Sequence, residues 1–98
     1  MNYKTDEKDC FRAEQKIPKD LRVIKASELL ILVEQKDEVI TKLCRDGYVW
    51  VDYLGEIRAA GLDYGYGGFH ISGYFVNILG RSRGVYVKKK NIIKFIYR

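Results

Sequence analysis

The sequence has almost none of the residues that build disulfide frameworks or metal centres. Its 98 residues include two cysteines, Cys10 and Cys44, and one histidine, His70. Neither cysteine belongs to a CxxC pair, and no histidine cluster has the spacing of metal ligands. These absences exclude a disulfide-stapled secreted scaffold. We expect neither a metal nor another cofactor, and we predict a protein of the reducing cytoplasm.

Long apolar runs are absent as well. No stretch approaches the roughly 18 consecutive apolar residues that a membrane-spanning helix needs. The first residues are polar, unlike those of a secretory signal. A hydrophobic share of 47%, a charged share of 32% and a single proline are typical of a folded chain. We therefore expect a soluble protein without membrane contact.

Acidic residues are missing from the last third of the chain. All 13 lie between Asp6 and Asp63, so that residues 1–63 carry a net charge of about −2 and residues 64–98 carry +7. A basic block without internal counter-ions must face water or a polyanion, unless an acid from the first part folds over it. This asymmetry makes nucleic acid the leading candidate partner.

The first half of the chain predicts an arm followed by a helix. Residues 1–20 balance five basic against five acidic groups with few apolar anchors, which indicates a polar arm, disordered or weakly helical. Residues 21–98 are expected to form one domain, with a short strand at Leu21 to Ile24. Ser27 is a suitable N-cap, and apolar residues then recur at helical spacing up to Asp46. A rival interpretation makes residues 29–44 a β-hairpin that turns at residues 35–37.

The second half predicts strands. Tyr48 to Leu54 alternates with period two, whereas Gly55 to Gly68 is most simply a glycine-rich loop with a helical turn at residues 56–60. Phe69 to Leu79 alternates again, and turns at residues 80–84 and 89–91 would then set off strands at residues 85–87 and 92–97. The last three strands read as an antiparallel meander.

These elements predict an α+β fold, in which one amphipathic helix packs on a small antiparallel sheet of three to five strands. The alternative is an all-β small barrel, similar in outline to SH3-like or OB-like architectures, if residues 29–44 form a hairpin. The outer edge of the strand at residues 92–97 could also pair across a two-fold axis, which would give a homodimer.

Catalysis finds little support in the sequence. A single histidine on an alternating strand is more often structural than a general base, and Cys44 lies among apolar helix positions typical of a buried thiol. The loop at residues 65–68 is rich in glycine, but it lacks the lysine and hydroxyl of a phosphate-binding P-loop. We predict that the protein is not an enzyme.

Two basic turns are the sharpest candidates for binding. Arg81 and Arg83 flank a serine in a glycine-bounded turn, a pattern that suits a phosphate or a carboxylate cluster, although charged hairpin tips are common. Lys88, Lys89 and Lys90 lie at the next turn, where they could bind a nucleic-acid backbone or merely discourage edge-strand aggregation.

Three aromatic residues share a parity that could place them away from the core. Trp50, Tyr74 and Tyr86 would form a base-stacking platform if exposed, and would belong to the core if buried. Together with the cations they complete the predicted binding residues: Arg81, Arg83, Lys88, Lys89, Lys90, Lys94, Trp50, Tyr74 and Tyr86.

Two functional hypotheses follow. In the first, a small non-enzymatic module binds nucleic acid with these cations on phosphates and the aromatic rings on bases. In the second, the same basic aromatic surface grips an acidic patch on a host protein, as an inhibitor or adaptor of phage or mobile-element type, anti-CRISPR-like. The charge pattern alone does not distinguish DNA from RNA, or nucleic acid from a protein partner.

Overall fold

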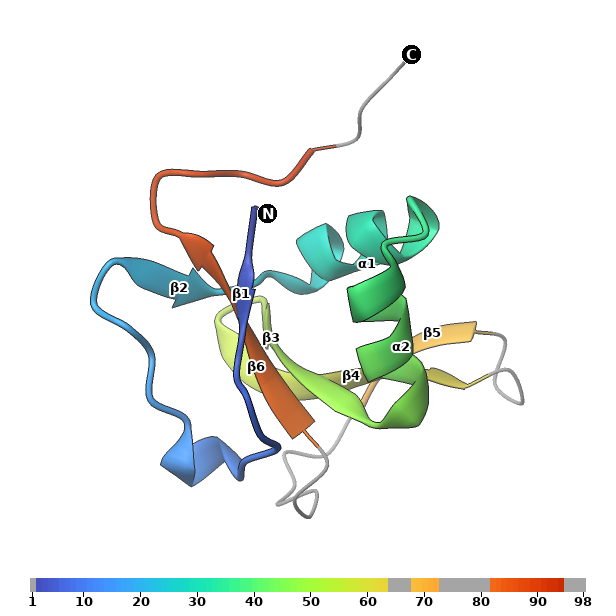
Figure 1. Cartoon of the computed structure of the whole chain (residues 1–98), viewed down its shortest axis with the longest axis horizontal. Coiled ribbons are helices and arrows are strands. Elements are labelled where there is room, and N and C mark those ends of the chain that lie inside the picture. The colour runs from blue at the N-terminus through green and yellow to red at the C-terminus, as the bar shows by residue number, and fades with distance from the viewer. Residues whose placement is uncertain (1, 64–67, 73–81, 95–98) are drawn as a thin grey trace.

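The structure is a computed structural model, and it describes residues 2–63, 68–72 and 82–94 (Figure 1). Two helices pack on a six-stranded mixed sheet, so the predicted α+β class is confirmed. In chain order the elements are β1 (Lys4–Thr5), a short 3-10 helix (Arg12–Glu14), β2 (Leu21–Val23), α1 (Ala26–Glu34), α2 (Glu38–Asp46), β3 (Tyr48–Tyr53), β4 (Glu56–Asp63), β5 (Gly68–Ile71) and β6 (Ser82–Lys88). Within these ranges, neither helix has the length and apolarity needed to cross a membrane.

The last described strand, β6, lies inside the sheet between β1 and β3. The strand order is β1-β6-β3-β4-β5, and β2 also pairs with β6. β3 runs parallel to β6, whereas the other pairings are antiparallel. The sheet thus has one strand more than the three to five predicted, and its β3–β6 pair is parallel where an antiparallel sheet was expected. The observed meander consists of β3, β4 and β5, because β6 returns to the sheet beside β3 instead of continuing from β5.

The single predicted helix is divided into two. Lys36 has a φ of 59°, in the left-handed region that ends a helix. The Asp37 carboxylate then accepts hydrogen bonds from the Ile40 amide at 3.0 Å and the Tyr3 hydroxyl at 2.8 Å, which caps α2. The rival interpretation placed a turn at the same residues but was wrong about strands, and the all-β alternative fails with it. α1 begins at Ala26, where Glu28 accepts from the Lys25 amide at 3.1 Å.

The predicted loop after Gly55 is a strand. Leu54 and Gly55 have φ angles of 53° and 89°, as a two-residue hairpin turn requires, and Tyr53 then pairs with Glu56. Ala59 and Ala60 in β4 are buried against β3, so that small residues which suggested a helical turn instead pack inside the sheet.

The remaining predictions divide between confirmation and correction. β3 and β2 lie where strands were expected, and the turn at Lys89 and Lys90 is confirmed by the Asn91 amide bond to the Lys88 carbonyl at 2.9 Å. Residues 82–84 belong to β6 rather than to a turn. Residues 92–94 are not in a strand, and the rest of the predicted segments at 73–79 and 95–97 lies outside the described residues.

The sheet is covered on both faces. Valines of β3 and β6 face the two helices and form the main core with Leu29, Leu32 and Ile40. The N-terminal arm runs over β6, and the short helix at its lower end lies on the side away from α1 and α2 (Figure 1). Tyr3 is buried in the core, and β1 pairs with β6, so residues 3–6 are not the loose arm that the sequence suggested.

Candidate nucleic-acid interface

A groove lined by lysines lies at the C-terminal end of β6. Its volume is about 640 Å³, and it is formed by three segments that are far apart in the sequence. We call it the lysine groove; its lining residues are Lys4, Pro18, Lys19, Asp20, Leu21, Lys88, Lys89, Lys90 and Asn91. Five of these nine carry an ammonium group and one carries a carboxylate, so the groove has a strong positive bias.

Strand pairing brings these segments together. Leu21 of β2 pairs with Lys88 of β6, and the Lys89 amide donates to the Asp20 carbonyl at 3.2 Å. On the other edge of β6, Lys4 pairs with Tyr86. The lysines are therefore fixed by backbone hydrogen bonds, while their side chains extend into solvent.

A buried ion pair anchors the chain that leaves the groove. Glu28 receives two hydrogen bonds from the Arg22 guanidinium, at 2.6 and 2.9 Å, and a third from the Ile93 amide at 2.9 Å. Arg22 also donates to the Asn91 carbonyl at 2.7 Å. Residues 91–93 are thus tied to α1 and β2, which holds the lysine turn in place.

Both members of this pair are held in their charged forms. Burial alone would raise the pKa of Glu28, but the hydrogen bonds from Arg22, Ile93 and Lys25 outweigh it and leave the pKa below its ordinary value. The hydrogen bond to Glu28 in turn raises the pKa of Arg22. Because Arg22 is neutralised in this way, it adds no free charge to the groove.

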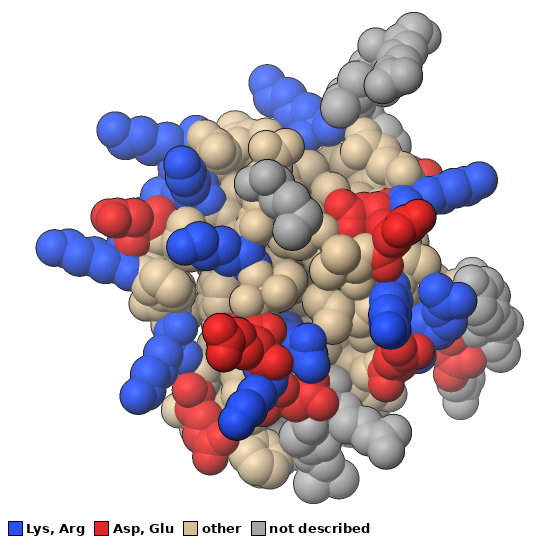
Figure 2. All heavy atoms as spheres, viewed as in Figure 1, with Lys and Arg blue, Asp and Glu red and all other residues tan. Residues whose placement is uncertain are grey.

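The lysines of the groove are in no ion pair within the described residues. In residues 2–63, 68–72 and 82–94 the ion pairs are Arg22–Glu28, Arg58–Glu56 and Arg83–Asp9, and none includes a groove lysine. Figure 2 shows basic side chains along the left and upper-left margin, over β2 and the end of β6, with one acidic group among them. Lower on the same face, acidic and basic groups alternate closely. Among the residues that the structure describes, five cations without ion pairs thus gather at the C-terminal end of β6.

At the other end of β6 an acid does fold over the basic block. Arg83 Nε lies 3.2 Å from Asp9 Oδ1, and both side chains are partly exposed. About five residues of strand, roughly 17 Å at about 3.3 Å per residue, separate Arg83 from Lys88. Arg83 is consequently not part of the lysine groove, and Arg81 lies outside the described residues.

The prediction that Trp50 and Tyr86 form an exposed stacking platform was wrong. Trp50 is 1% exposed and Tyr86 is 2% exposed, because the N-terminal arm covers this face of the sheet. Trp50 Nε1 donates to the Cys10 carbonyl at 3.1 Å, and the Tyr86 hydroxyl donates to the Asp6 carboxylate at 2.9 Å. Neither ring can stack on a base in this arrangement, so both belong to the core. Tyr74 lies outside the described residues.

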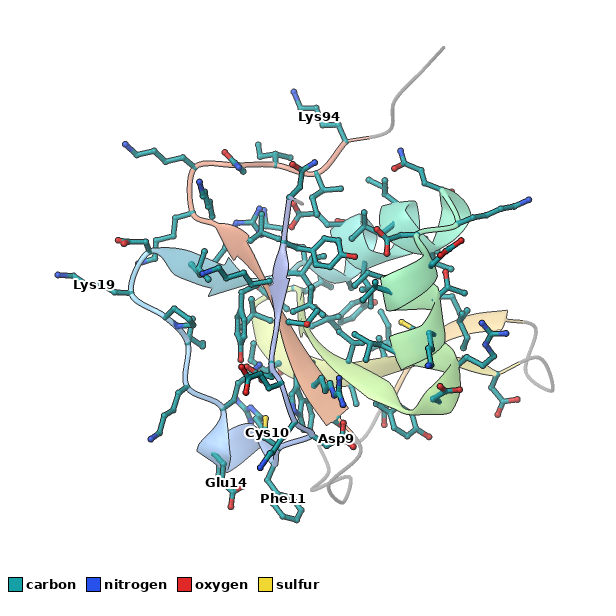
Figure 3. The ribbon with its side chains drawn as sticks, in the orientation of Figure 1. Asp9, Cys10, Phe11, Glu14, Lys19 and Lys94 are labelled. Atoms are coloured by element: carbon teal, nitrogen blue, oxygen red, sulfur yellow. The ribbon has the colours of Figure 1, made fainter. Side chains whose placement is uncertain are left out.

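The predicted cations are only partly brought together. Lys88, Lys89 and Lys90 line one groove, whereas Lys94 is exposed and lies at the top of the molecule, apart from Lys19 at its left margin (Figure 3). Lys4 and Lys19 were not among the predicted binding residues. Their segment has no net charge, and only its pairing with β6 would have indicated that its lysines join the others.

Thiols and metal-binding clusters are two kinds of reactive group that the described residues could contain. Cys44 is 1% exposed, as predicted for a core thiol, and burial raises its pKa to about 12, so the reactive thiolate is scarce. Across the described part of the chain, no group of three or more His, Cys, Asp or Glu side chains is placed to hold a metal ion.

Comparisons add no known relative to this picture. No protein-family model, curated protein or solved structure matches the chain. We therefore infer the function from the charge, burial and geometry of the chain itself.

Proposed function

We propose that this protein is a small non-enzymatic module that binds nucleic acid through the phosphates, and that the lysine groove is its contact surface. The observation that carries the proposal is the convergence of Lys4, Lys19 and residues 88–90 on one groove with a single acidic side chain. Lysines that are fixed by their backbone and left without ion pairs in the described ranges release counter-ions when they meet phosphates.

The lining favours contact with the backbone over recognition of bases. Lysine acts as a point charge on phosphate, whereas bidentate recognition of guanine is best performed by arginine and stacking is performed by aromatic rings. The lining of the groove contains neither arginine nor an aromatic residue. We therefore infer sequence-independent binding, with no preference for single strands based on stacking.

The test compares two variants of equal charge. Lys88→Glu, Lys89→Glu and Lys90→Glu together change the charge by six units, from +5 to −1. Lys36→Glu, Lys42→Glu and Arg45→Glu make the same change at exposed positions between and on the helices, outside the groove. Fluorescence anisotropy with a short DNA duplex at low salt should show at least a tenfold affinity loss, about 1.4 kcal/mol, for the groove variant. The control should lose much less. Equal losses in both variants would show that affinity depends on net charge alone and would contradict the assignment of the lysine groove.

An acidic protein surface is the second candidate partner, and Ile92 is the observation that favours it. This side chain is 69% exposed and follows the lysine turn directly, and protein interfaces combine an apolar centre with a polar rim. An inhibitor or adaptor of this kind should form a stoichiometric complex in host lysate that Ile92→Ser weakens. Failure to recover any partner at native expression levels counts against it.

A further inference from the structure

Leu54, at the tip of the β3–β4 hairpin, is unusual in both its backbone conformation and its exposure. Leu54 is 89% exposed and has a φ of 53°. Left-handed positions in two-residue hairpin turns are normally occupied by asparagine, aspartate or glycine, and an isolated large apolar side chain gains nothing from contact with water. Positions that break local preferences without local compensation are often functional. Leu54 is therefore a candidate contact residue.

A cleft lies directly beside this leucine. Its volume is about 380 Å³, which is ample for a leucine side chain, and Leu54 itself forms part of its wall. We call it the hairpin cleft; its lining residues are Lys25, Ala26, Ser27, Asp52, Tyr53, Leu54 and Gly55. An apolar projection and a recess of suitable size thus lie next to each other on one surface.

The charges around the tip are balanced. Lys25 and Asp52 line the cleft, and on the adjoining strand Arg58 donates to Glu56 at 2.7 Å and lies 5.3 Å from the centre of the Tyr53 ring. Two positive and two negative groups give no net charge, which does not suit a polyanion. The same set complements itself when a two-fold axis places the lysine of one copy near the aspartate of another.

We propose that a second copy of this chain docks on the hairpin tip, with Leu54 of each copy inserted into the hairpin cleft of the other. Because the projection and the recess lie side by side on one surface, a two-fold axis brings the projection of each copy to the recess of the other. Both sites are then occupied, so association stops at the dimer. This surface differs from the edge at residues 92–97 that the sequence suggested for a dimer. It is also separate from the lysine groove, since the two share no lining residue.

Sedimentation equilibrium at protein concentrations up to about 1 mM tests the proposal. This range detects dissociation constants from micromolar to millimolar, as expected for a small and weak interface. The wild-type chain should dimerise, and Leu54→Asn should raise the dissociation constant at least about tenfold. Asparagine followed by glycine is favoured in this turn, so the variant retains its fold, which circular dichroism verifies. Ile17→Asn, which removes another exposed apolar side chain, should leave the dimer unchanged.

A second variant tests the recess instead of the projection. Ser27 is exposed in the first turn of α1 and lines the cleft, so Ser27→Tyr fills the recess without removing Leu54. Each variant alone should be monomeric, whereas an equimolar mixture restores one of the two insertions and should partly recover association. A wild-type monomer at all concentrations, or no effect of Leu54→Asn, overturns the proposal, whatever the result for nucleic-acid binding.

Discussion

At the scale of single residues, one carboxylate of the N-terminal arm accepts two hydrogen bonds from β6, in addition to the backbone pairing of β1. Asp6 Oδ2 accepts hydrogen bonds from the Gly84 amide at 3.0 Å and from the Tyr86 hydroxyl at 2.9 Å. The ring of Tyr86 crosses over Gly84, so that a Cβ at residue 84 would meet the tyrosine hydroxyl and lie 2.7 Å from Asp6 Oδ2. Glycine is required here by space, and the arm depends on it.

Gly84→Ala should consequently lower the free energy of unfolding by about 1–3 kcal/mol, because the new methyl group displaces Tyr86 and Asp6. Urea denaturation followed by circular dichroism measures the change. Tyr86→Phe removes the hydroxyl that the methyl group meets, so the cost of Gly84→Ala should be smaller in that background. An equal cost in both backgrounds would show that the crowding does not involve the tyrosine.

The buried pair of Glu28 and Arg22 predicts a pH dependence. The pKa of Glu28 is lower in the folded chain than its ordinary value near 4.5, so the folded state favours the carboxylate. This contribution to stability is complete above the ordinary value and is lost as the pH falls through the lowered one. As the pH falls below the ordinary value near 4.5, the stability of the wild-type chain should therefore decrease more steeply than that of Glu28→Gln.

Glu28→Gln should also cost about 2–3 kcal/mol at neutral pH, because it leaves the guanidinium of Arg22 without its charged partner. Urea denaturation at a series of pH values measures both effects. Ser27→Gln, an exposed neighbour on the same turn, serves as the control and should leave the pH profile unchanged. Parallel profiles for Glu28→Gln and the wild type would contradict the assigned role.

At the scale of the elements, sequence patterns predicted those helices and strands whose residues show a clear local periodicity. Period-two alternation located β3, and apolar spacing located the helical region, although it predicted one continuous helix and placed a turn at residues 35–37 only in the rival hairpin. The patterns did not predict that β6 returns parallel to β3, since this depends on contacts between distant segments. They also missed β4, because its alanines and Gly61 gain their β-structure from burial between β3 and β5.

The candidate site shows the same limit. The run Lys88-Lys89-Lys90 was visible as a basic turn, but Lys4 and Lys19 join it only through the pairing of β1 and β2 with β6. Parity placed Trp50 and Tyr86 on the face away from the main core, yet it did not reveal that the arm covers this face. Alternation separates the two faces of a sheet but does not say whether both are buried.

The arm itself gives a prediction at this scale. Deleting residues 1–6 removes buried Tyr3, strand β1 and the carboxylate of Asp6, so it should strongly destabilise or unfold the chain. Thermal unfolding measures the loss. Substituting the exposed Glu7 and Lys8 with glutamine is the control and should have little effect. A truncated chain of unchanged stability would restore the interpretation of the arm as a loose segment.

At the scale of the whole molecule, the basic C-terminal third is divided by the fold. At one end of β6, Asp9 of the N-terminal arm pairs with Arg83, whereas the other end gathers lysines that lack ion pairs in the described residues. On the face that Figure 2 shows, basic side chains gather along one margin, over β2 and the end of β6. Such a margin attracts phosphates without reading bases.

The slope of log affinity against log salt for a DNA duplex tests this central claim most directly. Five lysines in contact with phosphates predict a slope of about −4.5, and reversing the charges of residues 88–90 should make it shallower by about 2.7 units. The control variant at residues 36, 42 and 45 should keep the wild-type slope. An unchanged slope in the groove variant, or the absence of binding by the wild-type chain at low salt, would contradict the claim that the lysine groove binds nucleic acid.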